Sequence, residues 1–125
     1  MPLTLRFHPE HLALCKLAST APVPSDILAH PLTCFFRTRK EATLICPSAL
    51  APQDVESEPG WIALEFVGAF DFALTGILTQ VATPLAEVGI SIFALSSFTT
   101  DYVLIKSENR DAAIAALRQA GHSFI

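Results

Sequence analysis

The sequence predicts an α+β fold in which 125 residues form two consecutive units, each a small sheet with helices on one face. Short runs of alternating apolar and polar residues predict strands, and stretches with apolar residues at helical spacing predict the helices between them. A segment containing Pro47, Pro52 and Pro59 separates the two parts. We therefore expect one unit in residues 1–58 and a second in residues 59–125.

The first unit is predicted to be abbreviated. Its expected strands are Leu12–Leu17, Thr33–Arg37 and Thr43–Cys46, and Leu3–Phe7 is a candidate for one more. Between the first two of these strands there is room only for a short helix, beginning after Ser25 or Asp26. The connector Pro47–Gly60 stands where a second helix would belong, so the unit has a strand, a short helix and a hairpin.

The second unit begins with a strand at Trp61–Val67, in which Ile62, Leu64 and Phe66 share one face. A helix is expected to follow, with Asp71 as its N-cap. The apolar face of this helix is formed by Leu74, Ile77, Leu78, Val81 and Leu85. We expect Pro84 to kink or break the helix and Gly89 to close it.

The rest of the second unit continues with strands at Ile90–Leu95 and Tyr102–Lys106, joined by a turn too short for a crossover, so that they form a hairpin. Ser107 or Asn109 is expected to cap a second helix with a narrow apolar stripe, which consists of Ala113, Ile114, Leu117 and Ala120. Gly121 ends this helix, and His122–Ile125 forms the last strand. The order βαββαβ is that of the ferredoxin-like fold.

Composition excludes several classes of function. The net charge of −4 argues against nucleic-acid binding, and the one basic cluster, Arg37, Arg39 and Lys40, suits the solvated tip of a hairpin. No run approaches the roughly 18 apolar residues of a membrane span. His8, Glu10 and His11 interrupt the N-terminus where a signal sequence would be apolar. We therefore expect a cytoplasmic protein without nucleic-acid or membrane partners.

No catalytic or metal site is predicted. Cys15, Cys34 and Cys46 are odd in number and lie among apolar neighbours, which favours buried, reduced thiols. The four histidines do not fall at the spacing of metal ligands, and the sequence has neither a phosphate-binding glycine loop nor a close acid–base pair. We expect a protein that is not an enzyme and needs no cofactor.

The stretch Gly68–Lys106, GAFDFALTGILTQVATPLAEVGISIFALSSFTTDYVLIK, resembles the ACT domains of a bacterial family related to the animal CASTOR arginine sensors. Thr38–Cys46, TRKEATLIC, and the start of the second unit at Gly60-Trp61 resemble the same family. The resemblance runs roughly from Leu12 to Phe124. It implies two tandem ACT-like units, and a non-catalytic regulatory or sensory module that binds a small ligand, in particular an amino acid.

The resemblance also implies a ligand site. In the arginine sensors the ligand lies between complete units; the matching positions here are Gly89, Ile90 and Ser91 on one side, and Thr100 and Asp101 on the other. Because this chain carries the tandem once, the equivalent site would need a homodimer. Gly89 would let a ligand approach the backbone, and the Asp101 carboxylate could pair with a cationic group. From the residues alone, Gly89 is equally a helix C-cap and Asp101 equally the end of a hairpin turn.

The loop Gly68-Ala69-Phe70 matches the general ACT ligand loop, although relatives often have Pro-Leu in place of Ala69-Phe70. The alternative function is a structural oligomerisation or protein-interaction module without a ligand. It rests on the second face of the predicted sheet, which is unusually apolar for a surface in contact with water.

Overall fold

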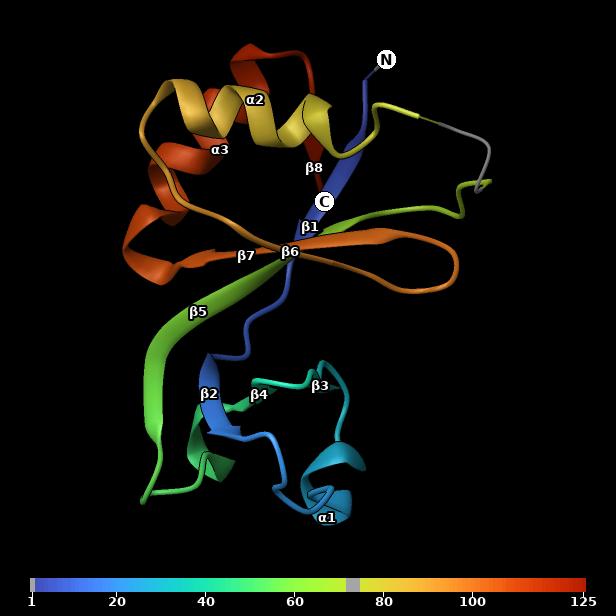
Figure 1. Ribbon diagram of the computed structural model, residues 1–125. Coiled ribbons are helices and arrows are strands. Elements are labelled where there is room, and N and C mark those ends of the chain that lie inside the picture. Colours follow the sequence, from blue (N-terminus) through green and yellow to red (C-terminus); the bar gives the residue numbers. More distant parts are fainter. Residues whose placement is uncertain (1, 72–74) are drawn as a thin grey trace. The chain divides into compact units, whose positions relative to one another are not determined.

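The computed structural model describes residues 2–71 and 75–125, and its contacts divide the chain into two units (Figure 1). The larger unit consists of Met1–Pro9 and Ile62–Ile125, and the smaller one of Glu10–Trp61. The first nine residues thus group with the second half of the chain, whereas a boundary after residue 58 would have kept them with the first half. The predicted α+β class is confirmed.

The larger unit has the predicted βαββαβ order. Its elements are β5 (Glu56–Phe66, of which this unit holds the last five residues), α2 (Thr79–Glu87), β6 (Phe93–Ser96), β7 (Asp101–Lys106), the 3-10 turn η2 (Ser107–Asn109), α3 (Arg110–Gln119) and β8 (Ser123–Phe124). The predicted strand at the N-terminus is confirmed as β1 (Thr4–Phe7). It lies between β5 and β8, giving the strand order β6-β7-β5-β1-β8, and runs antiparallel to β5 and parallel to β8.

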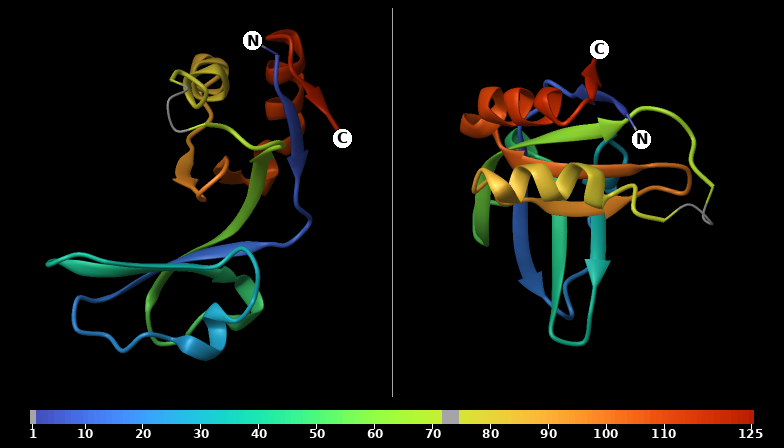
Figure 2. Two further views of the ribbon diagram at one scale, coloured as in Figure 1. Left: turned by 90° about the vertical axis from the view of Figure 1, so that its right-hand side faces the viewer. Right: turned by 90° about the horizontal axis from the view of Figure 1, so that it is seen from above.

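Helices α2 and α3 lie on one face of this sheet (Figure 2), where the core forms. The predicted inward face of β5, Ile62, Leu64 and Phe66, is buried there. The other buried members of the core are Leu3, Leu5, Ile77, Val81, Leu85, Ile90, Val103, Ile105, Ala113 and Leu117. At roughly 25 cal/mol per Å² of buried apolar surface, this cluster is the main stabilising element of the unit.

Helix α2 begins at Thr79, not at Asp71, so the prediction that Asp71 is its N-cap is wrong. Gly76 has φ +78°, a left-handed conformation that a right-handed helix cannot include, and its carbonyl accepts a hydrogen bond of 2.8 Å from the Thr79 hydroxyl. Leu78 precedes the helix and is 36% exposed, which also corrects its expected place in the core. Leu74, the first predicted member of the apolar face, lies outside the described residues.

The ends of the next elements also differ from the prediction. Helix α2 continues through Pro84 to Glu87, and β6 begins at Phe93 rather than at Ile90. Ile90 is buried, and its N–H donates to the Leu85 carbonyl at 2.9 Å, so this residue completes the end of the helix. At the second helix, Asn109 holds the N-cap position as one of the two predicted caps, but its side chain makes no capping hydrogen bond.

The smaller unit is a sheet of order β3-β4-β2-β5. Its elements are β2 (Leu12–Ala18), α1 (Ser25–Leu28), β3 (Cys34–Arg37), β4 (Glu41–Pro47), the 3-10 turn η1 (Ser48–Leu50) and the first part of β5. Strand β2 pairs with β4 over its whole length. The four-residue helix α1 confirms that only a short helix fits here.

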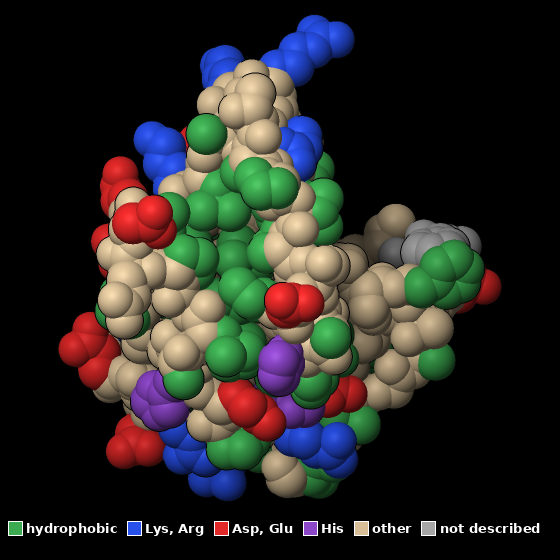
Figure 3. Space-filling view, turned by 90° about the horizontal axis from the view of Figure 1, so that it is seen from below, with side chains coloured by type: hydrophobic (Ala, Val, Ile, Leu, Met, Phe, Trp, Pro, Cys, Tyr) green, Lys and Arg blue, Asp and Glu red, His purple; other side chains and the backbone are tan. Residues whose placement is uncertain are grey.

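One side of this sheet carries the unit's apolar cluster. Its buried members are Ala13, Cys15, Leu44 and Cys46, with Phe35 and Leu28 among the half-buried side chains around them. Seen from below (Figure 3), hydrophobic side chains run along the middle of the unit, with acidic, basic and histidine side chains around them. A helix of four residues covers little of such a face, which explains why several of these apolar groups stay half-exposed.

The predicted connector is shorter than expected, because β5 already begins at Glu56 and pairs with β2 from there. Pro59 and Gly60 lie inside this strand, and Gly60 has φ +82°. The pairing register shifts between Leu12 and Leu14 beside them, so an irregularity in the ladder accommodates both residues. Among the described residues, no helix has the length and apolarity needed to cross a membrane.

Candidate functional site

A pocket of about 270 Å³ opens in the larger unit, between the segment that leads into α2 and the hairpin that joins β6 to β7. We call it the hairpin pocket. Its lining residues are Phe70, Asp71, Gly76, Ile77 and Leu78 from the first segment, and Ser96, Ser97, Phe98, Thr99, Thr100 and Asp101 from the hairpin.

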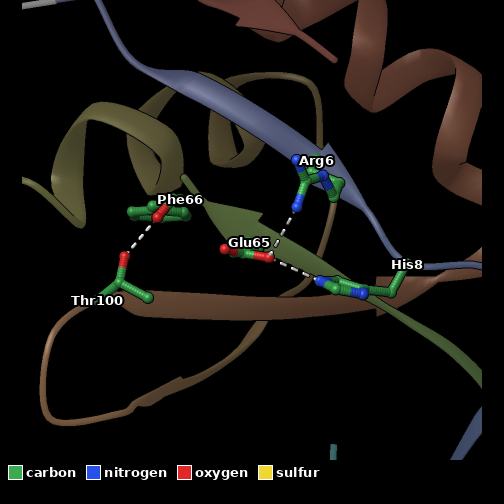
Figure 4. A network of polar contacts seen from close by, with 5 residues as sticks. All are labelled: Arg6, His8, Glu65, Phe66 and Thr100. Carbon is green, nitrogen blue, oxygen red and sulfur yellow. Dashed lines mark hydrogen bonds and ion pairs between the residues drawn. The ribbon is translucent and has the colours of Figure 1, made fainter. Parts of the chain in front are cut away.

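One hydrogen bond connects the hairpin to β5, and another connects the two walls of the pocket. The Thr100 hydroxyl donates to the Phe66 carbonyl at the end of β5, as Figure 4 shows, and the Phe70 N–H donates to the Thr99 carbonyl at 2.7 Å. Within the hairpin, the Ser97 N–H donates to the Thr100 carbonyl at 2.9 Å. Thr100 is only 8% exposed, so its hydroxyl holds the hairpin to the sheet and leaves the pocket walls preorganised.

The charged residues that line the pocket are all acidic among those that the structure describes. Asp71 and Asp101 both line it, and Asp101 accepts a hydrogen bond from the Ser96 hydroxyl, whereas none of the described lining residues is Lys or Arg. On the other side the pocket meets the start of α2, at Ile77 and Leu78. The N-terminus of a helix carries partial positive charge, although in α2 the N–H groups of Gln80, Val81 and Ala82 already donate to carbonyls of the preceding turn. The pocket therefore offers acidic residues to an ammonium group and the partially positive start of α2 to a carboxylate.

Of the eight residues predicted to bind ligand, three line this pocket: Phe70, Thr100 and Asp101. Gly68 and Ala69 belong to the same loop, directly before Phe70. Gly68 has φ +129°, a conformation that favours glycine and turns the chain away from β5.

The other three, Gly89, Ile90 and Ser91, lie before the start of β6, at its opposite end from the pocket. Ser91 lies five positions before Ser96 in the sequence, which is roughly 16 Å along an extended chain at 3.3 Å per residue. Gly89 has φ +77°, and its N–H donates to the Ala86 carbonyl at 3.0 Å. It therefore closes α2, which is the alternative that the sequence left open.

Sequence reasoning missed the hairpin residues Ser96–Thr99 and the segment Gly76–Leu78 as pocket walls. The sequence predicts a short turn between the two strands of the hairpin, and nothing in its spacing indicates which segment this turn faces. The sequence predicts a helix that begins seven residues earlier, directly after Asp71, and that includes Gly76. Gly76 has a positive φ and lines the pocket ahead of the helix, and a glycine within an otherwise helical pattern is the sequence signal for such an interruption.

A polar cluster lies on the face of the larger sheet that the helices leave open. The Glu65 carboxylate is shared between His8 Nε2, at 2.8 Å, and Arg6 Nη1, at 3.9 Å (Figure 4). Tyr102 is beside His8, with ring centroids 6.3 Å apart, and burial together with the negative charge of Glu65 raises the pKa of its hydroxyl. The cluster therefore consists of the Arg6–Glu65 ion pair with His8 and Tyr102 beside it. Nowhere in the described chain do three or more His, Cys, Asp or Glu side chains gather so as to hold a metal ion.

In the smaller unit, Cys15 and Cys46 are buried as predicted, while Cys34 is half-buried. Burial raises the pKa of the Cys46 thiol to about 11, together with the charge of Cys15 and the hydrogen bond that Cys46 donates to its sulfur. The pKa of Cys15 is also raised by burial, and the hydrogen bond from Cys46 lowers it in part. Both sulfurs are therefore protonated at neutral pH and poor nucleophiles.

The raised pKa of Cys46 predicts a loss of stability in alkali. A thiol whose pKa is higher in the folded than in the unfolded chain stabilises the fold fully below the unfolded value of about 9. This contribution is lost as the pH rises through about 11. In urea titrations across this range, the wild type should lose free energy of unfolding more steeply than Cys46→Ala. Parallel curves for the two proteins would contradict the prediction.

The fold and the pocket define a class of protein: a ferredoxin-like α+β module with a small preorganised pocket. A family model described as the ACT domain matches residues 56–119, and the chain belongs to the ACT domain family. ACT domains are typically regulatory modules that bind small ligands, and they are usually not catalytic.

Solved structures extend the match to the whole chain. A protein from Agobacterium tumefaciens is 30% identical and aligns over 100% of this chain and 93% of its own, with a TM-score of 0.93. A Vibrio cholerae protein of unknown function is 22% identical over 94% of this chain and 89% of its own, with a TM-score of 0.75. The ligand-free regulatory subunit of aspartate kinase from Thermus thermophilus is 15% identical over 94% of this chain and 97% of its own, with a TM-score of 0.65. The last two show a shared fold alone. None of the curated proteins compared with the sequence matches it.

Proposed function

We propose that this protein is a non-catalytic regulatory module that binds an amino acid in the hairpin pocket. The observation that carries the proposal is the pairing of opposite polarities across a small preorganised pocket. Asp71 and Asp101 line the same pocket as the residues that lead into α2, where the helix dipole favours an anion. The α-ammonium and α-carboxylate groups of a free amino acid need these two kinds of partner.

The size of the pocket supports a ligand of this class. At about 270 Å³ it is smaller than the roughly 300–1,000 Å³ of pockets that hold drug-sized molecules. The exposed ring of Phe98, at 80%, and that of Phe70 offer apolar surface for a side chain. The two acidic groups favour a ligand whose side chain is neutral or cationic over one that is acidic.

The finer parts of the resemblance belong to the same proposal. We assign the chain to the branch related to the CASTOR sensors, with the smaller unit as an abbreviated ACT-like unit and the working form as a homodimer. Gly89–Ser91 lie at the far end of β6 from the pocket, so they would contribute to a ligand site only from a second copy. The free, buried thiols of Cys15 and Cys46 suit a reducing compartment, so we place the protein in the cytoplasm.

A thermal-shift screen of the ligand-free protein against the proteinogenic amino acids tests the proposal. A ligand at 100 times its Kd should add about 2.7 kcal/mol to the free energy of unfolding, and thus raise the melting temperature. A response confined to one or a few amino acids is the expected result. No response to any of them, from a protein that sedimentation shows to be a dimer, would instead favour the oligomerisation module without a ligand.

A further inference from the structure

Helix α2 contains a defect that another part of the chain repairs. Pro84 has no N–H, so the carbonyl four residues earlier, that of Gln80, loses its normal donor within the helix. The side chain of His122 replaces it: Nε2 lies 2.9 Å from this carbonyl oxygen. A histidine just before the last strand therefore completes the hydrogen bonding of a helix 42 residues away in the sequence.

The other ring nitrogen of His122 holds the N-terminal strand segment. The Leu3 N–H donates to Nδ1 at 3.0 Å, so Nδ1 must carry a lone pair and the ring proton must lie on Nε2. The side chain is 7% exposed, and its two bonds satisfy two backbone groups in a poorly hydrated place. The ring acts as a strut between the segment before β1 and the first half of α2.

The hydrogen bond from His122 to Gln80 lies close to the hairpin pocket along helix α2. Gln80 is the second residue of α2, and its own N–H donates to the carbonyl of Ile77, which lines the hairpin pocket. Val81 and Ala82 donate to the carbonyl of Leu78, the next lining residue. The position of the pocket wall therefore depends on the first turn of α2, and that turn depends on His122 for a bond that Pro84 cannot give.

We propose that His122 is a positioning residue for the hairpin pocket: by holding Gln80 to Leu3, it fixes the first turn of α2 and so sets the affinity of the pocket for its ligand. A shallow groove of about 450 Å³ borders the strut, lined by Pro2, Thr79, Gln80, Thr83, Pro84 and Ala120 besides His122. None of these neighbours carries a charge, so the strut works through the hydrogen-bond geometry of the neutral ring. The effect on affinity rests on the function proposed above, whereas the effect on the helix does not.

Two amide variants separate the two halves of the strut. In His122→Asn the side-chain oxygen can occupy the place of Nδ1 and accept from Leu3, but no donor reaches Gln80. In His122→Gln the terminal amide nitrogen can occupy the place of Nε2 and donate to Gln80, but the acceptor for Leu3 is displaced. Pro84→Ala supplies the missing N–H within the helix, so it should repair the first variant and leave the second unchanged.

The ligand-free readout is amide hydrogen exchange, followed by NMR. His122→Asn is expected to raise the exchange rates of the Gln80, Val81 and Ala82 amides by at least tenfold relative to that of Ser97 in the hairpin, and the added Pro84→Ala should reverse this. In the wild type, ring ¹⁵N shifts should show the proton on Nε2. Two results would contradict the proposed role of His122. One is a ring proton on Nδ1, and the other is an exchange rate that changes by the same factor for all four amides in His122→Asn.

The affinity arm uses as probe the amino acid with the largest thermal shift in the wild-type screen. Its Kd should rise by at least fivefold in His122→Asn and return to within twofold of wild type when Pro84→Ala is added. An unchanged Kd beside altered exchange would overturn the positioning role alone. If no amino acid binds the wild type, the proposed function fails, and the exchange pattern still decides whether the strut exists.

Discussion

Replacing Leu5 by Ala is expected to lower the free energy of unfolding of the larger unit by about 2–5 kcal/mol, the usual cost of a large-to-small change in a core. Leu5 lies on β1, is 0% exposed and stands opposite Phe66 of β5 in the ladder. Its removal leaves a cavity in the centre of the cluster beneath α2 and α3, even though it lies in the N-terminal strand.

The two units can be distinguished by following hydrogen exchange in β7 for the larger unit and in β4 for the smaller one. In the Leu5→Ala variant, the exchange rates of the backbone amides should rise first in β7. Leu50→Ala is a matched control, because Leu50 is exposed at 37% and its truncation should cost less than about 0.5 kcal/mol. If Leu5→Ala loosened β4 and spared β7, the assignment of β1 to the larger unit would be wrong.

Replacing Asp101 by Asn is expected to weaken the amino-acid binding proposed for the hairpin pocket by roughly 10- to 100-fold. A hydrogen bond to a charged group contributes about 1.5–3 kcal/mol, and each 1.4 kcal/mol is a factor of ten in Kd. The substitution removes the charge that would pair with a ligand ammonium, but keeps an oxygen that can accept from the Ser96 hydroxyl. The hairpin should therefore keep its shape while the pocket loses affinity.

Isothermal titration with the amino acid found in the screen measures this effect. Asp111→Asn removes an equal charge from α3, where the side chain is 99% exposed, and should leave Kd unchanged. If Asp101→Asn and Asp111→Asn bound equally well, the carboxylate of Asp101 would have no part in recognition, and the hairpin pocket would lose its main support as the ligand site.

Much of the fold could be predicted because its patterns are local. The alternation of Ile62, Leu64 and Phe66, and the helical spacing of Ala113 and Leu117, depend only on which side of each element is apolar. The element ends were harder to predict. Asp71 is a residue type that often caps helices, yet α2 begins only at Thr79, because the positive φ of Gly76 cannot be part of a right-handed helix.

The residues of the candidate site could likewise be predicted only in part. The resemblance identified Phe70, Thr100 and Asp101, which do line one pocket, and the loop residues Gly68 and Ala69 beside it. It could not show that the Thr100 hydroxyl is committed to the Phe66 carbonyl, 34 residues away in the sequence. This bond depends on how the fold brings the end of β5 next to the hairpin, and a local sequence pattern carries no information about that distance.

The sequence by itself determined the α+β class, the βαββαβ order and the inward faces of the strands, because hydrophobic periodicity is a property of each short segment. Only the tertiary structure decided that β1 joins the larger sheet and that His122 supplies the hydrogen bond that Pro84 removes from α2. These pairings join residues tens of positions apart. They arise because a buried backbone group without a partner is costly and takes its partner from whatever part of the chain the fold brings near.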